Sequence, residues 1–180
     1  GSEMCIRDSI QPFTTKNGTE AVNLVARNRK EIDDKPVILL GTHYNSRNVA
    51  DLDPNENRRT RPVPGANGGA SGTAVLLELA NRIDPSEFEF RLCFAFFDAA
   101  DNDGLEGWDS AEGSRYFINT LTDIEELESC VGPVAVVILD LVGAGPELSF
   151  EISSNQELVQ SIQSAAVDSG YENWLAGQVS

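Results

Sequence analysis

Lysine, histidine and cysteine are scarce in this chain of 180 residues. There is one histidine, and the only lysines are Lys16, Lys30 and Lys35, so arginine supplies most of the positive charge. Acidic residues outnumber basic ones and give a net charge of −16. Such a surface repels nucleic acid and anionic membranes, so we expect neither as a partner.

Long apolar runs and a secretory signal are also lacking. Residues 1–9 show no periodicity, and we interpret them as a leader left by cloning or assembly. Because residues 1–9 are set aside, the lack of a secretory signal does not indicate where in the cell the protein is located. Residues 10–180 are long enough to bury a substantial core, and we predict a single domain over them.

The cysteines Cys5, Cys93 and Cys130 are odd in number, and their spacing matches no metal motif. Cys93 lies inside an apolar run, where a cysteine usually serves as a small core residue. We therefore predict that Cys93 packs in the core and that the chain has no disulfide framework.

The apolar run Glu89–Phe97 is the segment around which the fold is expected to form. It is short, aromatic and bounded by polar residues, which favours a buried strand over a helix. Asp98 and Asp101 follow at once. Functional sites of α/β proteins collect beyond the carboxyl ends of strands, although a solvated acidic loop explains these residues equally well.

The remaining patterns predict alternating strands and helices, and hence an α/β three-layer sandwich with a mixed sheet flanked by helices. A hairpin is expected between the strands 20–29 and 36–42, a long loop over 48–64, and a helix over 73–83 with Ser71 as N-cap. Residues 171–180 show no clear structure. Further strands are expected over 133–139 and 147–152, and the apolar run 133–139 predicts that the first of them is buried. Further helices are expected over 110–121 and from 154 or 155 to 167.

Four polar positions follow predicted strands or turns: His43, the glycine-rich stretch 65–72, Asp98–Asp101 and Asp140. One imidazole and several carboxylates at neighbouring strand ends form a donor set that zinc accepts. A packed or capping histidine and a solvated aspartate are the alternative interpretations.

The glycine-rich stretch admits two other interpretations, both weak. A phosphate-binding loop would need a Lys-Ser/Thr pair and a directly preceding strand. A serine nucleophile at Ser71 would need glycine where Thr73 stands. The only histidine lies far upstream, so a Ser-His-Asp triad has little support.

Several blocks in this order resemble the M28 zinc peptidases, and most closely their glutaminyl-peptide cyclotransferase-like branch. The resemblance spans roughly Thr19 to the C-terminus. The blocks are Leu40–Arg47, Pro62–Ala80, Phe96–Asp101, Gly107–Asp109, Gly113–Phe117 and Ile138–Gly143.

The resemblance implies a zinc-exopeptidase-like fold with zinc above the sheet and a peptide amino terminus as substrate. His43 and Asp101 resemble zinc ligands. Asp140 resembles the acid that binds metal in the peptidases and holds the substrate amine or a hydrogen-bond chain in the cyclases. Trp108 lies near where cyclase-like members place an aromatic side chain beside the pocket.

The departures from the family pattern concern the chemistry. Gly68 replaces an aspartate ligand, Ala100 replaces the glutamate that acts as general base, and Asn45 replaces an aspartate that orients the metal histidine. The family also has a later histidine ligand, and this chain ends at Ser180, about where the final strand and that ligand would begin. A methyl group takes no proton, and zinc with fewer than three protein ligands is weakly held.

We therefore expect a zinc-dependent aminopeptidase or glutaminyl cyclotransferase-like protein, partial and inactive as given, with zinc weak or absent. The alternative is a pseudoenzyme or peptide-binding module that kept the fold. An unrelated acidic α/β domain is the third hypothesis. A missing strand would expose the sheet, so self-association is also expected. Many relatives are extracellular or periplasmic.

Overall fold

The computed structural model describes residues 6–28, 34–84, 87–145 and 147–178. The chain forms two compact units, one up to Leu141 and one from Val142 on. Each unit is described by itself below. The assignment of residues 10–180 to a single domain stays a prediction.

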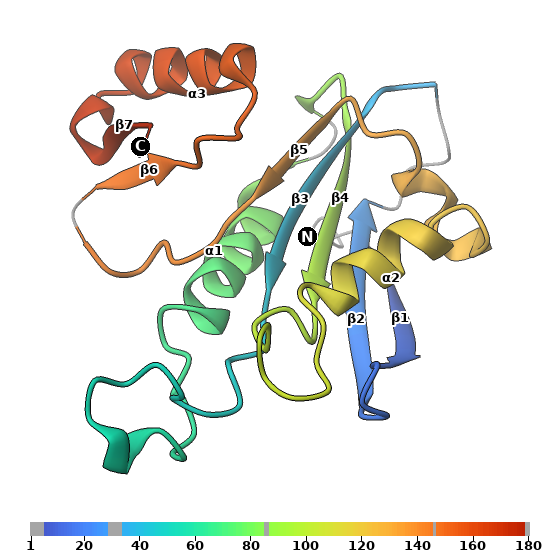
Figure 1. Ribbon diagram of the computed structural model, residues 1–180. Helices are drawn as coiled ribbons and strands as arrows, with labels where there is room; N and C mark the ends of the chain where they lie inside the picture. The colour runs from blue at the N-terminus through green and yellow to red at the C-terminus, as the bar shows by residue number, and fades with distance from the viewer. Residues whose placement is uncertain (1–5, 29–33, 85–86, 146, 179–180) are drawn as a thin grey trace. The chain divides into compact units, whose positions relative to one another are not determined.

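Within the described residues of the first unit, five strands form one mixed sheet in the order β1-β2-β4-β3-β5 (Figure 1). β2 pairs antiparallel with both β1 and β4, whereas β3 pairs parallel with both β4 and β5. The predicted mixed sheet is therefore confirmed. The strands are β1 (Ile6–Thr14), β2 (Glu20–Asn28), β3 (Val37–His43), β4 (Arg91–Phe97) and β5 (Ala135–Ile138).

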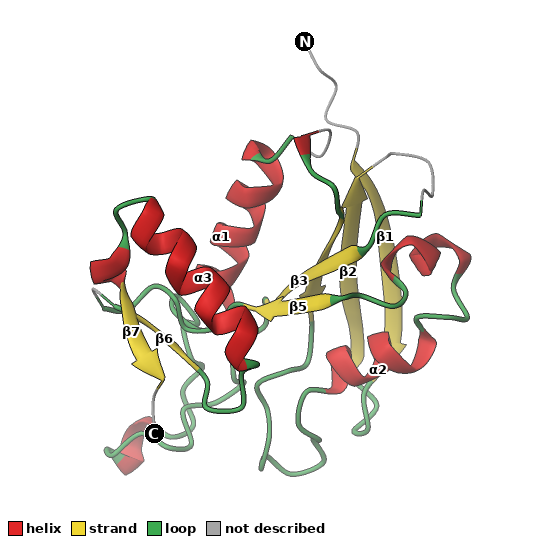
Figure 2. Ribbon diagram, turned by 90° about the horizontal axis from the view of Figure 1, so that it is seen from above, coloured by secondary structure: helices red, strands yellow, loops and turns green. Residues whose placement is uncertain are grey.

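Helices α1 (Gly69–Arg82) and α2 (Glu112–Thr120) lie on opposite faces of this sheet (Figure 2). Leu76 of α1 packs against the β4 residues that face it, and Phe117 of α2 packs on the other face. The 3-10 helix η3 (Glu125–Cys130) joins α2 there through Leu127, which is fully buried. The predicted three-layer arrangement is confirmed.

The predicted hairpin between the second and third strands is wrong. β4 lies between them, because its continuous apolar residues are buried on both faces and occupy the centre of the sheet. The hairpin partner of β2 is β1, and the turn between them contains Asn17 and Gly18, the latter with a φ of 86°. An Asn-Gly pair flanked by strands is a hairpin signal that the sequence analysis did not use.

β1 begins within the segment set aside as a leader. Residues 6–9 pair with 25–28 of β2 through their backbones. Backbone pairing places few demands on side chains, so an added segment can extend an edge strand. The leader origin of residues 1–9 stays a prediction, and residues 1–5 lie outside the described residues.

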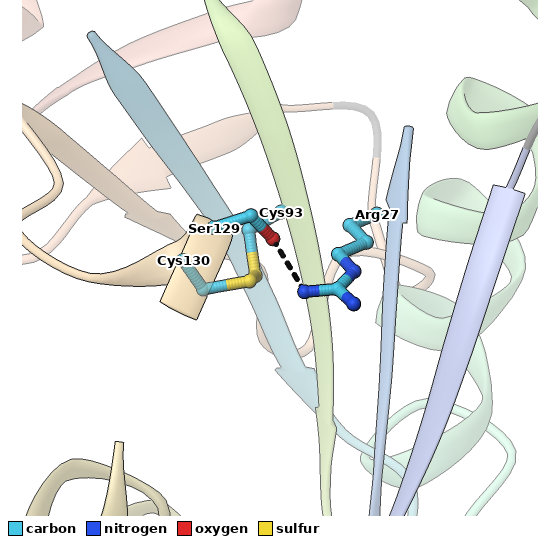
Figure 3. Close-up of a disulfide and its surroundings, with 4 residues drawn as sticks. All are labelled: Arg27, Cys93, Ser129 and Cys130. Atoms are coloured by element: carbon cyan, nitrogen blue, oxygen red, sulfur yellow. Dashed lines mark hydrogen bonds between the residues drawn. A yellow bond between two sulfur atoms is a disulfide. The ribbon is translucent and has the colours of Figure 1, made fainter. Parts of the chain in front are cut away.

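The prediction that the chain has no disulfide is wrong. Cys93 in β4 is bonded to Cys130 at the end of η3, and both residues are completely buried (Figure 3). Core packing of Cys93 is correct, but the thiol is not free. The bond closes a loop with a sequence separation of 37, which stabilises the fold by about 4 kcal/mol in the chain-entropy model.

The strand 133–139 is shorter and less buried than expected. β5 lies at the edge of the sheet, and Val136 and Ile138 are 45% and 56% exposed. Its apolar sequence predicts a buried strand, but a sequence pattern does not show whether a strand has neighbours on one side or on both. The expected self-association through this sheet stays a prediction.

The second unit contains a helix and a small sheet. α3 (Gln156–Asp168) has Asn155 as N-cap, as predicted, and the predicted strand over 147–152 appears as β6 (Leu148–Phe150). The expectation of no structure after 171 is wrong, since η4 (Glu172–Trp174) and β7 (Leu175–Gln178) follow and β7 pairs with β6. Among the described residues, no helix is both long and apolar enough to cross a membrane.

Candidate functional site

The carboxyl ends of β3 and β4, the residues after β5 and the first turn of α1 meet at one edge of the sheet. His43 is the last residue of β3, Asp98 and Asp101 follow β4, and Asp140 follows β5. Parallel pairing of β3 with both neighbours brings these ends to the same edge.

His43 is held by both nitrogens of its ring and is 9% exposed. Nδ1 lies 2.9 Å from the backbone oxygen of Asn45, and Nε2 lies 3.1 Å from Oδ1 of Asp140. A carbonyl oxygen only accepts, so Nδ1 carries a proton and donates it. The backbone of Asn45, and not its side chain, therefore orients the ring. This orientation needs no carboxylate at position 45.

Nε2 faces the carboxylate of Asp140, whose side chain is 54% exposed. Two acceptors do not bond to each other. Nε2 and Asp140 therefore make a hydrogen bond when the ring is protonated, or share a cation between them when it is neutral. This is the arrangement that metal-binding histidines use.

Gly68, at the start of α1, lies beside His43 at the same edge of the sheet. It is the N-cap residue of α1, and its φ of −61° lies outside the left-handed region that favours glycine. A Cβ atom at this position would lie 3.8 Å from Asp101 Oδ2 and 3.8 Å from His43 Cε1. A side chain at position 68 would therefore enter the space between these two groups.

The residues present do not complete a zinc site. His43 Nε2 and Asp140 Oδ1 are suitable donors, but no three His, Cys, Asp or Glu side chains converge anywhere in the described ranges. A resident zinc needs three protein ligands. The family resemblance predicts a further ligand at position 68, whose Cβ would lie 3.8 Å from both Asp101 Oδ2 and His43 Cε1.

Two non-glycine residues with left-handed backbone flank the site aspartates. Ala99 has a φ of 50° directly after Asp98, and Leu141 has a φ of 51° directly after Asp140. Such conformations cost on the order of 1 kcal/mol each and are concentrated at functional sites. They turn the chain sharply at the two strand ends.

Asp98 connects the ends of three strands through its carboxylate. Its Oδ2 accepts bonds from the Val22 backbone N–H at 3.1 Å and the Tyr44 hydroxyl at 3.0 Å. Burial, followed by the negative charge of Asp98, raises the pKa of Tyr44 to about 12. We interpret Asp98 as a structural carboxylate that holds the end of β4 against β2 and β3.

The loops after β3 and β4 are fastened to each other by further hydrogen bonds. The Asn45 amide oxygen accepts from the backbone N–H of Ala100, and the Asn48 backbone N–H donates to the side chain of Asn102, both at 2.9 Å. The Arg47 guanidinium donates to the backbone oxygens of Asp101 and Asp103, again at 2.9 Å.

Arg47 is itself fixed by Asp51, whose Oδ2 lies 2.7 Å from its Nη2. The Asp51 carboxylate accepts this hydrogen bond, which raises the pKa of Arg47 and holds the guanidinium in one orientation. Sequence reasoning missed Arg47, Tyr44 and Asn48, because most of their contacts involve a backbone atom on one side, which carries no sequence signal.

The glycine-rich stretch allows α1 to approach these strand ends closely. A Cβ on Gly69 would lie 2.5 Å from the Tyr44 oxygen, and one on Gly72 would lie 2.8 Å from the Leu139 oxygen. Ser71 is not the N-cap, because α1 begins two residues earlier and the Ser71 hydroxyl donates to the Asn67 oxygen. The glycines therefore serve close packing.

Trp108 and Ala100 are the remaining predicted site residues. Trp108 is half-buried and packs on the cluster of Phe13, Ala21 and Ala99, next to the loop that carries Asp101. Ala100 lies within that loop, with its backbone bound to Asn45. In the structure His43 contacts Asp140, and a Cβ at Gly68 would lie near His43 and Asp101, but the three side chains do not converge as a metal-binding group. The functional roles of all six positions stay predictions.

A model of peptidase family M28 matches residues 23–173 of this chain. A search of curated proteins gives no match.

Solved structures with the same fold include a glutaminyl cyclase from Tannerella forsythia, 23% identical, with a TM-score of 0.76 over 98% of this chain. A Zn-dependent exopeptidase from Parabacteroides distasonis is 22% identical, with a TM-score of 0.76 over 98% of the chain. A leucine aminopeptidase precursor from Bacteroides thetaiotaomicron is 23% identical, with a TM-score of 0.74 over 97%. The chain spans 65%, 64% and 63% of their respective lengths.

Proposed function

Because the chain belongs to peptidase family M28, we propose that its site receives the amino-terminal end of a peptide but performs no exopeptidase or glutaminyl cyclase reaction as the sequence stands. The family and the similar structures support the general class of function. The loss of catalysis is inferred from the side chains at two positions.

The geometry at Gly68 carries the proposal. A Cβ at this position would lie within van der Waals distance of both His43 and Asp101. A metal-ligating side chain at position 68 would therefore lie beside them, but glycine has no side chain. His43 and Asp140 alone form a two-donor set, which holds zinc weakly.

The second loss concerns proton transfer. Ala100 stands where the family resemblance places the general base, and its methyl group neither accepts nor donates a proton. With position 68 restored but position 100 unchanged, the site would still lack that group. The two losses are therefore separable by substitution.

Binding of a peptide amino terminus needs less than catalysis does. The Asp140 carboxylate is half exposed, Asp101 is exposed, and both lie near His43. Carboxylates at this edge are suited to an α-ammonium group, which they pair with by charge-assisted hydrogen bonds.

A second candidate is an active zinc hydrolase or cyclase that takes its further ligands from additional chain. The solved structures are longer than the part that this chain covers, which motivates this alternative. It predicts turnover by a longer form of the protein without any change at positions 68 and 100.

The test is the zinc content of purified variants, measured by elemental analysis after dialysis. We expect the unsubstituted chain to retain little zinc and Gly68→Asp to retain a near-stoichiometric amount. Ala66→Asp is the matched control, because it adds the same charge at an exposed position of the same loop. If Gly68→Asp combined with Ala100→Glu retains no more zinc than the unsubstituted chain, the site assignment is wrong. Release of amino-terminal residues by the unsubstituted chain would contradict the proposed lack of catalysis.

A further inference from the structure

The Cys93–Cys130 disulfide connects the central strand to the segment that leads into β5. Cys93 lies in β4 and Cys130 is the last residue of η3, with Cα atoms 5.6 Å apart. Next to the bond, the Arg27 guanidinium donates to the Ser129 hydroxyl at 2.9 Å (Figure 3). The end of η3 is therefore fixed covalently to β4 and by a hydrogen bond to β2.

The side chains of β5 specify its register only weakly. The strand reads Ala-Val-Val-Ile, and its one strand partner among the described residues is β3. Val136 and Ile138 are about half exposed, so a shift by two residues would place similar side chains on the same faces. One specific contact exists, since Ile138 fills the space that Gly41 leaves open.

The position of Asp140 depends on that register. A shift of two residues would move it roughly 7 Å along the strand direction, at 3.3 Å per residue. In the observed register Asp140 lies 3.1 Å from His43, and the Thr42 hydroxyl donates to the Leu139 oxygen at 2.8 Å. The pairing of Asp140 with His43 therefore requires that β5 start at the right place.

Cys130 lies shortly before the start of β5. The connection 131–134 is short, and its last residue already donates from the Val134 backbone N–H to the Val37 oxygen at 2.8 Å. We propose that the Cys93–Cys130 disulfide fixes the register of β5 and thereby positions Asp140 against His43. Both cysteines are positioning residues, since neither contacts His43 itself.

The only histidine of the chain gives a direct test. The ring ¹⁵N and ¹H signals of His43 are recorded by NMR for the unsubstituted chain and for Cys93→Ala combined with Cys130→Ala. Asp140→Ala supplies the reference spectrum of a His43 that lacks its partner. We expect the double cysteine variant to move to the Asp140→Ala positions. Signals that stay at the native positions without the disulfide would overturn the proposal.

Leu127→Ala is the control for a general loss of stability. Leu127 lies in η3, is completely buried and packs in the same cluster as the disulfide, but its truncation leaves the bond intact. We expect the His43 signals to remain at their native positions in this variant. If they shift as in the double cysteine variant, the cysteines act only through core stability and the proposal is wrong.

Amide exchange on the unsubstituted chain tests the premise of a fixed register, independently of whether the double variant folds. The backbone N–H groups of Val134 and Leu139 bond to Val37 and Gly41 at the two ends of β5. A fixed register predicts that they exchange as slowly as the amides of β4. Rapid exchange at both ends, as in a frayed edge strand, would overturn the proposal.

Discussion

Asn23 is the buried polar residue whose removal should cost the fold most. It is completely buried in β2, and its amide group bonds to three different elements. Nδ2 donates to the Gln11 side chain and to the Gly113 oxygen, both at 2.8 Å, and Oδ1 accepts from the Asp98 backbone N–H at 3.1 Å. Asn23 therefore joins β1, α2 and the site end of β4.

The cost of Asn23→Ala follows from the partners left behind. Three groups would each lose a hydrogen bond, at about 1–3 kcal/mol for every buried group that finds no substitute. Two of these bonds are buried and the one to the Asp98 N–H is partly buried, so we expect a total loss of about 3–6 kcal/mol. Domains of this kind have total unfolding free energies of roughly 5–15 kcal/mol, so the variant should be close to unfolding.

Urea unfolding measures this loss, followed by tryptophan fluorescence in a Trp174→Phe background. Trp108 is then the only tryptophan, so the signal reports the unit up to Leu141. Asn119→Ala, an exposed change on α2, is the control and should alter the free energy by no more than about 0.5 kcal/mol. A loss below about 1 kcal/mol for Asn23→Ala would refute the reasoning.

Three further predictions concern other parts of the chain. Tyr44 should ionise near pH 12, which ultraviolet absorbance measures. Because its folded-state pKa lies above the unfolded value of about 10, the unfolding free energy should fall between pH 10 and 12. Tyr44→Phe should abolish the part of that fall that comes from Tyr44. Arg47→Ala should speed amide exchange in the loop 100–103, whereas Arg59→Ala should not, and equal exchange in both variants would contradict the loop contacts. Asn155→Ala removes the side chain that accepts from the Leu158 backbone N–H, so α3 should lose about 1 kcal/mol, measured by amide exchange within the helix; unchanged protection would count against the cap.

The central part of the fold could be predicted because local patterns and topology rules agree there. The apolar run up to Phe97 forms the most buried strand, and the polar residues that follow it lie at the expected sheet edge. His43 and Asp140 meet because parallel strands bring their carboxyl ends together. Neither conclusion required knowledge of side-chain packing.

Strand order and cysteine pairing could not be predicted in the same way. Strands adjacent in sequence pair often, which favoured a β2–β3 hairpin, but the burial of β4 placed it between them. Cys93 and Cys130 are separated by 37 positions, and their pairing depends on η3 packing beside the middle of β4. Spacing alone does not carry that information.

The loop contacts around the site were also invisible in the sequence. Arg47 donates to backbone oxygens, and the backbone oxygen of Asn45 orients His43. Such contacts depend on loop conformation, and any residue type can supply a backbone acceptor. Asparagine at position 45 therefore suggested that His43 lacks a group to orient its ring, whereas the backbone oxygen of Asn45 orients it.

The central claim is that His43, Asp140 and position 68 belong to one zinc site that lacks one ligand side chain. Anomalous diffraction from crystals of Gly68→Asp grown with zinc tests it most directly. The account predicts one strong zinc peak within bonding distance of His43 Nε2, of Asp140 and of the introduced carboxylate. A zinc peak elsewhere, or a carboxylate at position 68 that points away from His43 with no metal beside it, would contradict the account.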